Sequence, residues 1–295
     1  DFIENLPFLS RMILPDNYTF TQQRPAAYPD LENKVYITGV WSDGDNIQYV
    51  YNYMKFTLWD GGGGDAHGVV PTGWTANPSL VHLAPYMLKY YYENATSNDY
   101  FIGGLSGKGY CKYDYFTNMT FMEDFISESN LLYEKADIKE GRIWMIDTVA
   151  DQVTKSTKLR GIFDGYLGRM EFKEPKVING VPIVSSVGVQ KDKESYLHFI
   201  QLVQHATPGR PQFYFFHLHC WESNTTIWTD LALQLEALEN VEVVRPDTFI
   251  ALLQQWEPGP MNIDLIIPYS IILGSIIVLG VIMVFKRKTR KAILN

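Results

Sequence analysis

Short runs of β-branched and aromatic residues alternate along most of the chain with longer amphipathic segments. The short runs are typical of buried strands, whereas the longer segments show the 3.6-residue period of helices. Strands are predicted at residues 35–41, 69–75, 100–105, 142–147, 159–164, 181–187, 212–219 and 241–244. Helices are predicted at 47–59, around 83–91, at 121–132, from the fourth strand to about 158, around 197–203, at 226–239 and at 248–256, and a less regular segment follows the fifth strand.

Eight strand-helix alternations within about 225 residues favour an α/β fold, a (β/α)8 TIM-like barrel, whether regular or distorted. A doubly wound open sheet is the alternative. In both architectures ligands bind at the carboxyl ends of the strands. Residues that directly follow the predicted strands are therefore the first candidates for a functional site.

One apolar stretch lies outside this alternation. Leu265 to Phe285 contains no charged residue, and its 21 residues would span about 31 Å as a helix, which matches the hydrocarbon core of a bilayer. Five basic residues follow: Lys286, Arg287, Lys288, Arg290 and Lys291. Because Lys and Arg beside a span resist translocation, the sequence predicts one transmembrane helix with a cytoplasmic carboxyl terminus.

The predicted organisation therefore has five parts. They are a lead-in segment at 1–33, an external barrel-like domain at 34–257, a juxtamembrane linker at 258–264, the membrane helix at 265–285 and a basic tail at 286–295. The chain begins with Asp1, so we expect a processed product or a fragment whose delivery signal has been removed. We expect a single-pass protein of the cell membrane.

Four Asn-x-Thr triplets lie on the side that this orientation makes external. Each can accept an N-linked glycan, and the predicted sites are Asn17, Asn94, Asn118 and Asn224. The formal net charge is −8, and the five basic residues after the span outweigh Asp264, so the external part carries an excess of 12 acidic charges. This charge excludes nucleic acid and anionic lipid as partners of the external part.

Aromatic residues make up 14% of the chain, with 19 Tyr and 7 Trp, which suits a protein that stacks sugars as well as one with an aromatic core. Cys111 and Cys220 follow different predicted strands, so we expect no disulfide between them. The Gly61–Gly64 run lacks the Lys and Ser/Thr of a phosphate-binding loop, and no dinucleotide fingerprint follows a strand. No nucleotide cofactor is expected.

Carboxylates follow several predicted strands. Asp43 and Asp45 come after the first, Asp164 ends the fifth, and Glu222 comes after the seventh. Hydrolysis of a glycosidic bond needs one carboxylic acid to protonate the leaving oxygen and a second carboxylate as nucleophile or base. These four residues are the predicted catalytic set. Alternatively, Asp43 or Asp45 caps the helix that begins near residue 47, and we expect Asp247 to cap the last helix.

His217 and His219 lie two apart on a predicted strand, so their side chains face the same way. With Asp43 and Asp45 they could hold a divalent metal that activates water, as in metal-dependent sugar deacetylases. Alone, they could hydrogen-bond sugar hydroxyls or be satisfied within the core. A divalent metal is therefore expected only under the deacetylase alternative, and no cofactor is expected otherwise.

Several segments together indicate a family. They read VYITGVWSDGDN at 35–46, GWTANP at 73–78, LAPYMLKYY at 83–91, NDYFIGGLSGKGY at 98–110, and Gly165-Tyr166. In these segments and their order the chain resembles the barrel-like C-terminal domain of the GxGYxYP family of proposed glycoside hydrolases, over roughly residues 34–256. The family is named for a Gly-x-Gly-Tyr-x-Tyr-Pro signature, whose first half is matched by Gly107, Gly109 and Tyr110. The second half is lost, because Cys111-Lys112-Tyr113 stands where x-Tyr-Pro is expected. Only some 30 residues precede the barrel, where family members tend to carry an N-terminal domain.

The resemblance implies a carbohydrate hydrolase. It marks nine residues as the site: Asp43, Asp45, Asn46, Trp74, Asn77, Ser106, Gly107, Gly109 and Tyr110. With Trp41, His217, His219 and Trp221, the non-catalytic members form the predicted substrate-binding set. The leading hypothesis is a membrane-anchored, external glycoside hydrolase that acts on a glycan. The alternatives are a metal-dependent polysaccharide deacetylase and a non-catalytic glycan-binding or structural surface protein; a homo-oligomer is compatible with each.

Overall fold

The computed structural model describes residues 14–15, 17–61, 66–145, 147–164, 174–190, 203 and 209–256. The predicted linker, membrane helix and tail lie outside these residues, as do most of the helix predicted around 197–203 and the Gly165-Tyr166 pair. Within the described part of the chain, no helix combines the length and the apolar character needed to cross a bilayer.

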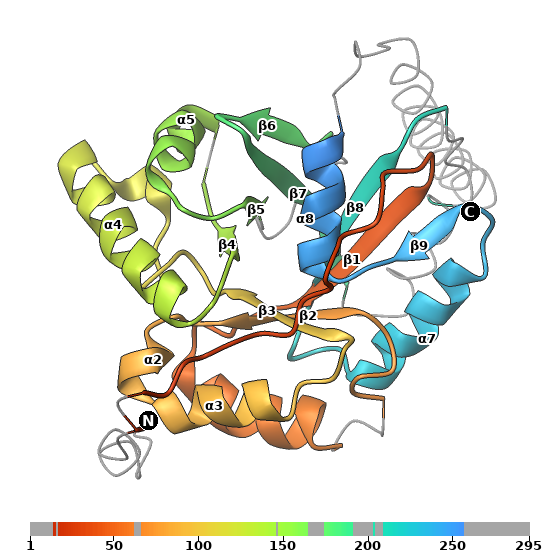
Figure 1. Ribbon diagram of the computed structural model, residues 1–295, viewed down its shortest axis with the longest axis horizontal. Coiled ribbons are helices and arrows are strands. Elements are labelled where there is room, and N and C mark those ends of the chain that lie inside the picture. Colours follow the sequence, from red (N-terminus) through yellow and green to blue (C-terminus); the bar gives the residue numbers. More distant parts are fainter. Residues whose placement is uncertain are drawn as a thin grey trace, which may run out of the picture. The chain divides into compact units, whose positions relative to one another are not determined.

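Seven parallel strands form a closed barrel (Figure 1). They are β1 (Val35–Trp41), β2 (Thr72–Ala76), β3 (Asp99–Gly103), β4 (Glu140–Ile143), β5 (Gly161–Asp164), β7 (Val181–Gln190) and β8 (Gln212–Leu218). The ring closes because β1 pairs with β8 along its whole length and with β2 at Val40 and Trp41. The predicted α/β barrel is therefore confirmed, but with seven strands in the ring.

The eighth predicted strand does not enter the ring. It is β9 (Val241–Val243), and it pairs only with Val35–Ile37 at the start of β1. The second half of β1 pairs with β2 instead, so β9 extends the sheet only at the amino-terminal end of the barrel. A further strand, β6 (Lys176–Ile178), forms an antiparallel hairpin with β7 that was not predicted. Asn179 and Gly180 form its turn with positive φ of 50° and 78°, as an Asn-Gly hairpin turn requires.

The helices follow the predicted alternation. They are η1 (Tyr49–Trp59), α2 (Leu80–Leu83), α3 (Pro85–Glu93), η2 (Tyr113–Tyr115), α4 (Met119–Lys135), α5 (Asp147–Ser156), α7 (Thr225–Glu236) and α8 (Pro246–Gln255). The amino-terminal ends of α4 and α7 are capped by Asn118 and Asn224, whose side-chain oxygens accept backbone amides. Figure 1 shows α3, α4, α5 and α7 around the outside of the strands.

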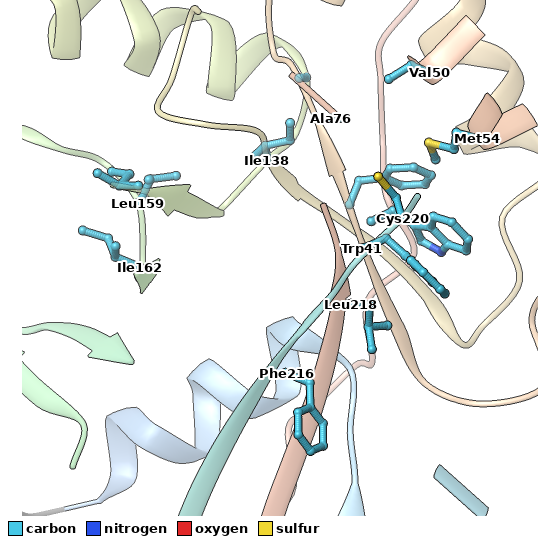
Figure 2. Packing of buried hydrophobic residues seen from close by; sticks show 14 of the residues in the cluster. Trp41, Val50, Met54, Ala76, Ile138, Leu159, Ile162, Phe216, Leu218 and Cys220 are labelled. Carbon is cyan, nitrogen blue, oxygen red and sulfur yellow. The ribbon is translucent and has the colours of Figure 1, made fainter. Parts of the chain in front are cut away.

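Alternate residues of each strand build two cores. Outward-facing side chains such as Trp41 and Leu218 pack on the surrounding helices together with Cys220 and Met54 (Figure 2). Inward-facing side chains such as Tyr36, Val40, Phe163 and Phe215 form the second cluster with apolar residues of α8. Because α8 contacts β1, β3, β4 and β7, it covers the amino-terminal end of the barrel. The carboxyl ends of the strands are left for a site.

The lead-in segment is bound to the barrel by side chains. The Gln22 amide accepts a hydrogen bond from the Phe101 backbone amide (2.7 Å) and donates one to its carbonyl (2.9 Å). Since β3 pairs with β4 only at Gly103, Gln22 satisfies backbone groups that no neighbouring strand reaches. Arg24 forms an ion pair with Asp137 at 2.7 Å beside it.

Candidate functional site

The turn after β1 is locked against the ends of the next strands. Asp43 adopts a positive φ of 65°. The Gly44 amide donates to the Thr75 hydroxyl at 2.8 Å, and its carbonyl accepts from the Asn77 amide at 2.9 Å. A Cβ at Gly44 would lie 1.6 Å from the carbonyl oxygen of Thr75, so only glycine fits. This turn therefore sets the directions of Asp43 and Asp45.

Asp43 receives two side-chain hydrogen bonds. The Ser42 hydroxyl donates to its Oδ2 at 2.5 Å, and the Cys220 thiol, just after β8, donates to the same oxygen at 3.0 Å. Burial and the charge of Asp43 raise the pKa of Cys220, so the thiol keeps its proton. Cys111 and Cys220 are both free thiols, and Cys220 serves as a hydrogen-bond donor to the acid.

Asp45 lies two residues on and is half-buried. Burial raises its pKa to about 6; the charge of Asp43 adds to this effect and the charge of Arg142 opposes it. A carboxyl group with such a pKa is still largely protonated in mildly acidic solution and can release its proton during a reaction. Asp45 therefore has the properties of a general acid.

A buried Arg–His pair lies beneath these carboxylates. Arg142, on the inner face of β4 and only 1% exposed, donates from an Nη to the Nδ1 of His217 at 2.5 Å. Burial lowers the pKa of Arg142 to about 10, while the negative charges of Asp43, Asp45 and Asp164 act in the opposite direction. Burial, then Arg142 and His219, lower the pKa of His217 well below its ordinary value, so His217 is neutral. One buried cation thus lies within electrostatic reach of three carboxylates.

Sequence reasoning missed Arg142. The signal was present, since an arginine interrupts the otherwise uncharged run Gly-Arg-Ile-Trp-Met of a predicted barrel strand. A charged residue is almost never fully buried unless it is paired. An inward-facing arginine in a barrel strand therefore predicts acidic partners nearby.

The histidines face the same way, as predicted: their rings lie 6.4 Å apart and are inclined by only 15°. The Nδ1 of His217 is occupied by Arg142, whose positive charge also disfavours a second cation. Across the described residues, no group of three or more His, Cys, Asp or Glu side chains is arranged to hold a metal ion. Asp43, Asp45, His217 and His219 therefore do not fit the metal site of the deacetylase alternative.

The other two predicted catalytic residues are placed differently. Asp164 ends β5 on the face opposite to the inward Phe163, and it lines a small pocket beside α5 with Asp147 and Ser185. Its charge still reaches Arg142. Glu222 lies on the exposed turn after β8, where its backbone amide donates to the His219 carbonyl at 3.3 Å. The structure therefore brings together Asp43 and Asp45 rather than all four acids.

The predicted sugar-stacking tryptophans divide into two kinds. Trp41 and Trp74 are 0% and 1% exposed and stack on each other within the outer core, with ring centroids 6.0 Å apart. They offer no exposed face to a substrate, which contradicts their place in the predicted substrate-binding set; they follow the outward alternation of β1 and β2. Trp221 and Tyr110, in contrast, are 48% and 59% exposed.

Several predicted binding residues hold the site in shape. Ser106 is buried, and its hydroxyl oxygen accepts from the Trp144 amide at 3.2 Å. Gly107 has a φ of 120°, and a Cβ there would lie 2.4 Å from the Ser129 hydroxyl. The side-chain oxygen of Asn77 accepts from the Ser79 amide at 2.9 Å. These buried groups support the loops, whereas Gly109 borders open space.

The capping predictions are also revised. Asn46, rather than either aspartate, accepts the Gln48 and Tyr49 amides at 3.0 and 3.2 Å where the helix after β1 begins. Asp247 lies in the first turn of α8 but forms an ion pair with Arg245 at 2.7 Å instead of a cap. Of the predicted glycosylation sites, Asn17, Asn94 and Asn118 are exposed and Asn224 is half-buried.

Comparison with known families supports the resemblance seen in the sequence. Residues 33–254 match the family model described as "GxGYxYP putative glycoside hydrolase C-terminal domain". The chain belongs to the GxGYxYP family. The match includes the turn of Asp43 and Asp45, Arg142 and both histidines. No relative is detected among curated proteins.

Solved structures share the barrel of this GxGYxYP domain. A "putative hydrolase" from Bacteroides thetaiotaomicron VPI-5482 is 27% identical with a TM-score of 0.71, over 87% of this chain and 52% of that one. The chain thus spans about half the length of that hydrolase. A "probable polysaccharide deacetylase" from Pseudomonas aeruginosa PAO1 is 9% identical with a TM-score of 0.55, over 77% of this chain and 94% of that one. PuuE allantoinase is 10% identical with a TM-score of 0.52, over 77% of this chain and 93% of that one. These two structures share the fold alone.

Proposed function

We propose that this GxGYxYP domain is a carbohydrate hydrolase that cleaves glycosidic bonds, with Asp45 as the proton donor and Asp43 as the second catalytic carboxylate. The observation that carries the proposal is the locked Asp43-Gly44-Asp45 turn, which presents two carboxylates in unlike surroundings above one buried cation. Glycosidases need such a pair, one acid protonated and the other charged. Membership of the family supports the same reaction class.

Each residue has a role in this proposal. Asp45 protonates the leaving oxygen, while the charge of Asp43 stabilises the positive charge that develops on the sugar ring, as nucleophile or as base towards water. Arg142 offsets the accumulated negative charge, and without it the pKa of Asp45 would be higher still. His217 holds Arg142 through the 2.5 Å hydrogen bond. The ring of His219 faces the same way as that of His217, and we assign it to bind a sugar hydroxyl.

The test is turnover of a panel of polysaccharides and aryl glycosides, measured as released reducing sugar or aryl alcohol. Asp45→Asn and Asp43→Asn should each lower turnover of natural substrates by about 10²–10⁴-fold, the usual contribution of acid-base catalysis. The exposed Asp147→Asn is the matched control. If Asp45→Asn hydrolyses every substrate as fast as wild type, the assignment is refuted.

One observation favours a second function, which is glycan binding without cleavage: the signature is interrupted at Cys111-Lys112-Tyr113. Binding of a glycan without any released product over long incubation would support it. Release of acetate in place of reducing sugar, abolished by a chelator, would instead support the deacetylase alternative.

We also propose that the domain faces the outside of a cell membrane, anchored by the helix predicted at 265–285. The exposure of Asn17, Asn94 and Asn118 is compatible with glycans on that face. Removal of N-glycans should increase the gel mobility of the chain, and protease added to intact cells should digest the barrel but spare the tail. A chain whose barrel is protected would contradict this placement.

A further inference from the structure

An exposed indole stands on one side of the aspartate turn. Trp221 follows Cys220, whose thiol bonds Asp43 at 3.0 Å. Its ring packs against Tyr53 and Tyr49 of η1, with centroids 4.7 and 5.4 Å away. These contacts hold the ring from one side, yet 48% of the residue remains exposed. An aromatic face fixed from behind and open to solvent is a stacking platform.

A second exposed ring stands on the other side. Tyr110, in the loop that follows β3, is 59% exposed. Its ring contacts the ring of Trp144 at a centroid distance of 5.5 Å and an angle of 73°. Trp144 lies two residues beyond Arg142 and is fixed by the Lys112 ammonium group, 5.0 Å from its ring centroid. Tyr110 is therefore also supported from behind.

The order of the strands places the two rings on opposite sides of the acids. Around the barrel the order runs β8, β1, β2, β3, β4. Trp221 follows β8, the aspartate turn follows β1, Tyr110 follows β3 and Trp144 follows β4. All these residues lie beyond the carboxyl ends of parallel strands, and so at the same end of the barrel.

Two buried polar atoms at this end of the barrel lack partners. The Nε1 of Trp144 and the Nδ1 of His219 are buried and make no hydrogen bond in the described part of the chain. Burying such an atom without a partner costs free energy, so each is suited to a hydroxyl group that a ligand would bring. Trp144 is only 7% exposed, so its unpartnered nitrogen belongs to a buried side chain and not to a surface residue.

From these observations we infer that the site binds an oligosaccharide or polysaccharide chain laid across the barrel mouth, with sugar units stacked on both Trp221 and Tyr110 and the bond to be cleaved between them. The inference rests on the proposed function for the position of the cleaved bond and adds the substrate class. A site for a single terminal sugar would need one platform only.

The experiment measures binding separately from turnover, by calorimetry with the full-length Asp45→Asn protein. The probes are linear cello-, malto-, xylo-, laminari- and N-acetylchito-oligosaccharides of two to six units. In the series that binds, affinity should rise with chain length. Trp221→Ala and Tyr110→Ala should each weaken binding of the hexasaccharide about tenfold, the effect usual for an aromatic anchor. At least one of the two variants should weaken binding of the disaccharide much less, because a disaccharide is too short to need both rings.

Controls separate a lost contact from a lost fold. Trp221→Phe and Tyr110→Phe keep an aromatic face and should restore most of the affinity. Phe56→Ala removes an exposed ring, 57% exposed, near the far end of η1, and should leave binding unchanged. Unfolding temperatures of all variants should stay close to that of the parent protein, because both residues are about half exposed and lie outside the buried core.

The outcomes are distinct from those for catalysis. Affinity that does not increase beyond two units, alanine variants that bind like Phe56→Ala, or no binding in any series would overturn the inference, even if Asp45 proves to be the acid. Conversely, length-dependent binding that needs both rings supports the inference even if Asp45→Asn still turns over substrate, which would refute only the proposed catalytic assignment.

Discussion

Replacing Asp45 by Asn should stabilise the protein at neutral pH while it removes the proposed acid. Burial raises the pKa of Asp45 from 3.8 to about 6, so the folded state binds the proton more tightly than the unfolded state does. At about 1.36 kcal/mol per pH unit, ionising this group in the fold costs about 3 kcal/mol. Partial exposure makes this an upper bound, and about 1–3 kcal/mol is the expected gain for Asp45→Asn.

The dependence on pH is the sharper part of this prediction. Below pH 3.8 the carboxyl is protonated in both states and costs nothing; between 3.8 and about 6 the folded state holds more protons, so wild-type stability falls as pH rises. Above about pH 7 the carboxyl is ionised in both states and the loss is complete. The stability difference between Asp45→Asn and wild type should therefore be near zero at pH 3.5 and constant above about pH 7.

Tryptophan fluorescence during urea unfolding measures this difference in the full-length chain, because all seven tryptophans precede residue 257 and report on the barrel. Asp147→Asn, an exposed carboxylate paired with Lys176, is the control and should show little pH-dependent change. A variant Asp45→Asn that is no more stable than wild type at pH 7.5, or equally stabilised at pH 3.5, would refute the reasoning from burial.

Three further perturbations test the surroundings of the site. Arg142→Gln should destabilise the fold by about 3–5 kcal/mol in denaturant unfolding, since it leaves buried groups unpaired. It should also move the alkaline limb of the pH–rate profile to higher pH, because Arg142 lowers the pKa of Asp45. Gly44→Ala should cost about 3 kcal/mol or more in thermal unfolding, whereas Gly109→Ala, with open space around it, should cost less than about 1. Gln22→Ala should cost about 2–4 kcal/mol, as it orphans two backbone groups of β3, and unchanged urea midpoints would contradict this.

The fold was largely predictable because hydrophobic patterning reports which residues lie in strands. The first strand, 35–41, and the seventh, 212–219, match β1 and β8 to within one residue. Closure was harder to predict, since it depends on which half of β1 meets which neighbour. The residue pattern of Val241–Val243 predicts a strand whether or not that strand joins the ring. Only its pairing with Val35–Ile37 shows that it stays outside the ring.

The arrangement of the candidate site was only partly predictable, for a related reason. The rule that ligands bind at strand ends selected Asp43 and Asp45 as candidates, and their catalytic role stays a prediction. It gave no information on which way a side chain turns, so Trp41 and Trp74 were assigned to a sugar although they face the outer core. Arg142 escaped notice because it lies within a strand rather than after one.

Two buried charged residues on the inner face of β4, Glu140 and Arg142, differ in how well they are paired. At the amino-terminal end, Glu140 accepts hydrogen bonds from Tyr100 at 2.7 Å and from the Nε of Arg160 at 3.0 Å, so its charge is fully paired. At the carboxyl end, the negative charges of Asp43, Asp45 and Asp164 act on Arg142, and its Nε lacks a partner within the described chain. Glu140 and Arg142 are two apart on β4 and lie in register with Gly161 and Phe163 of β5. The unpartnered Nε of Arg142 lies at the end that holds the proposed site, which favours the interpretation that a ligand completes this end.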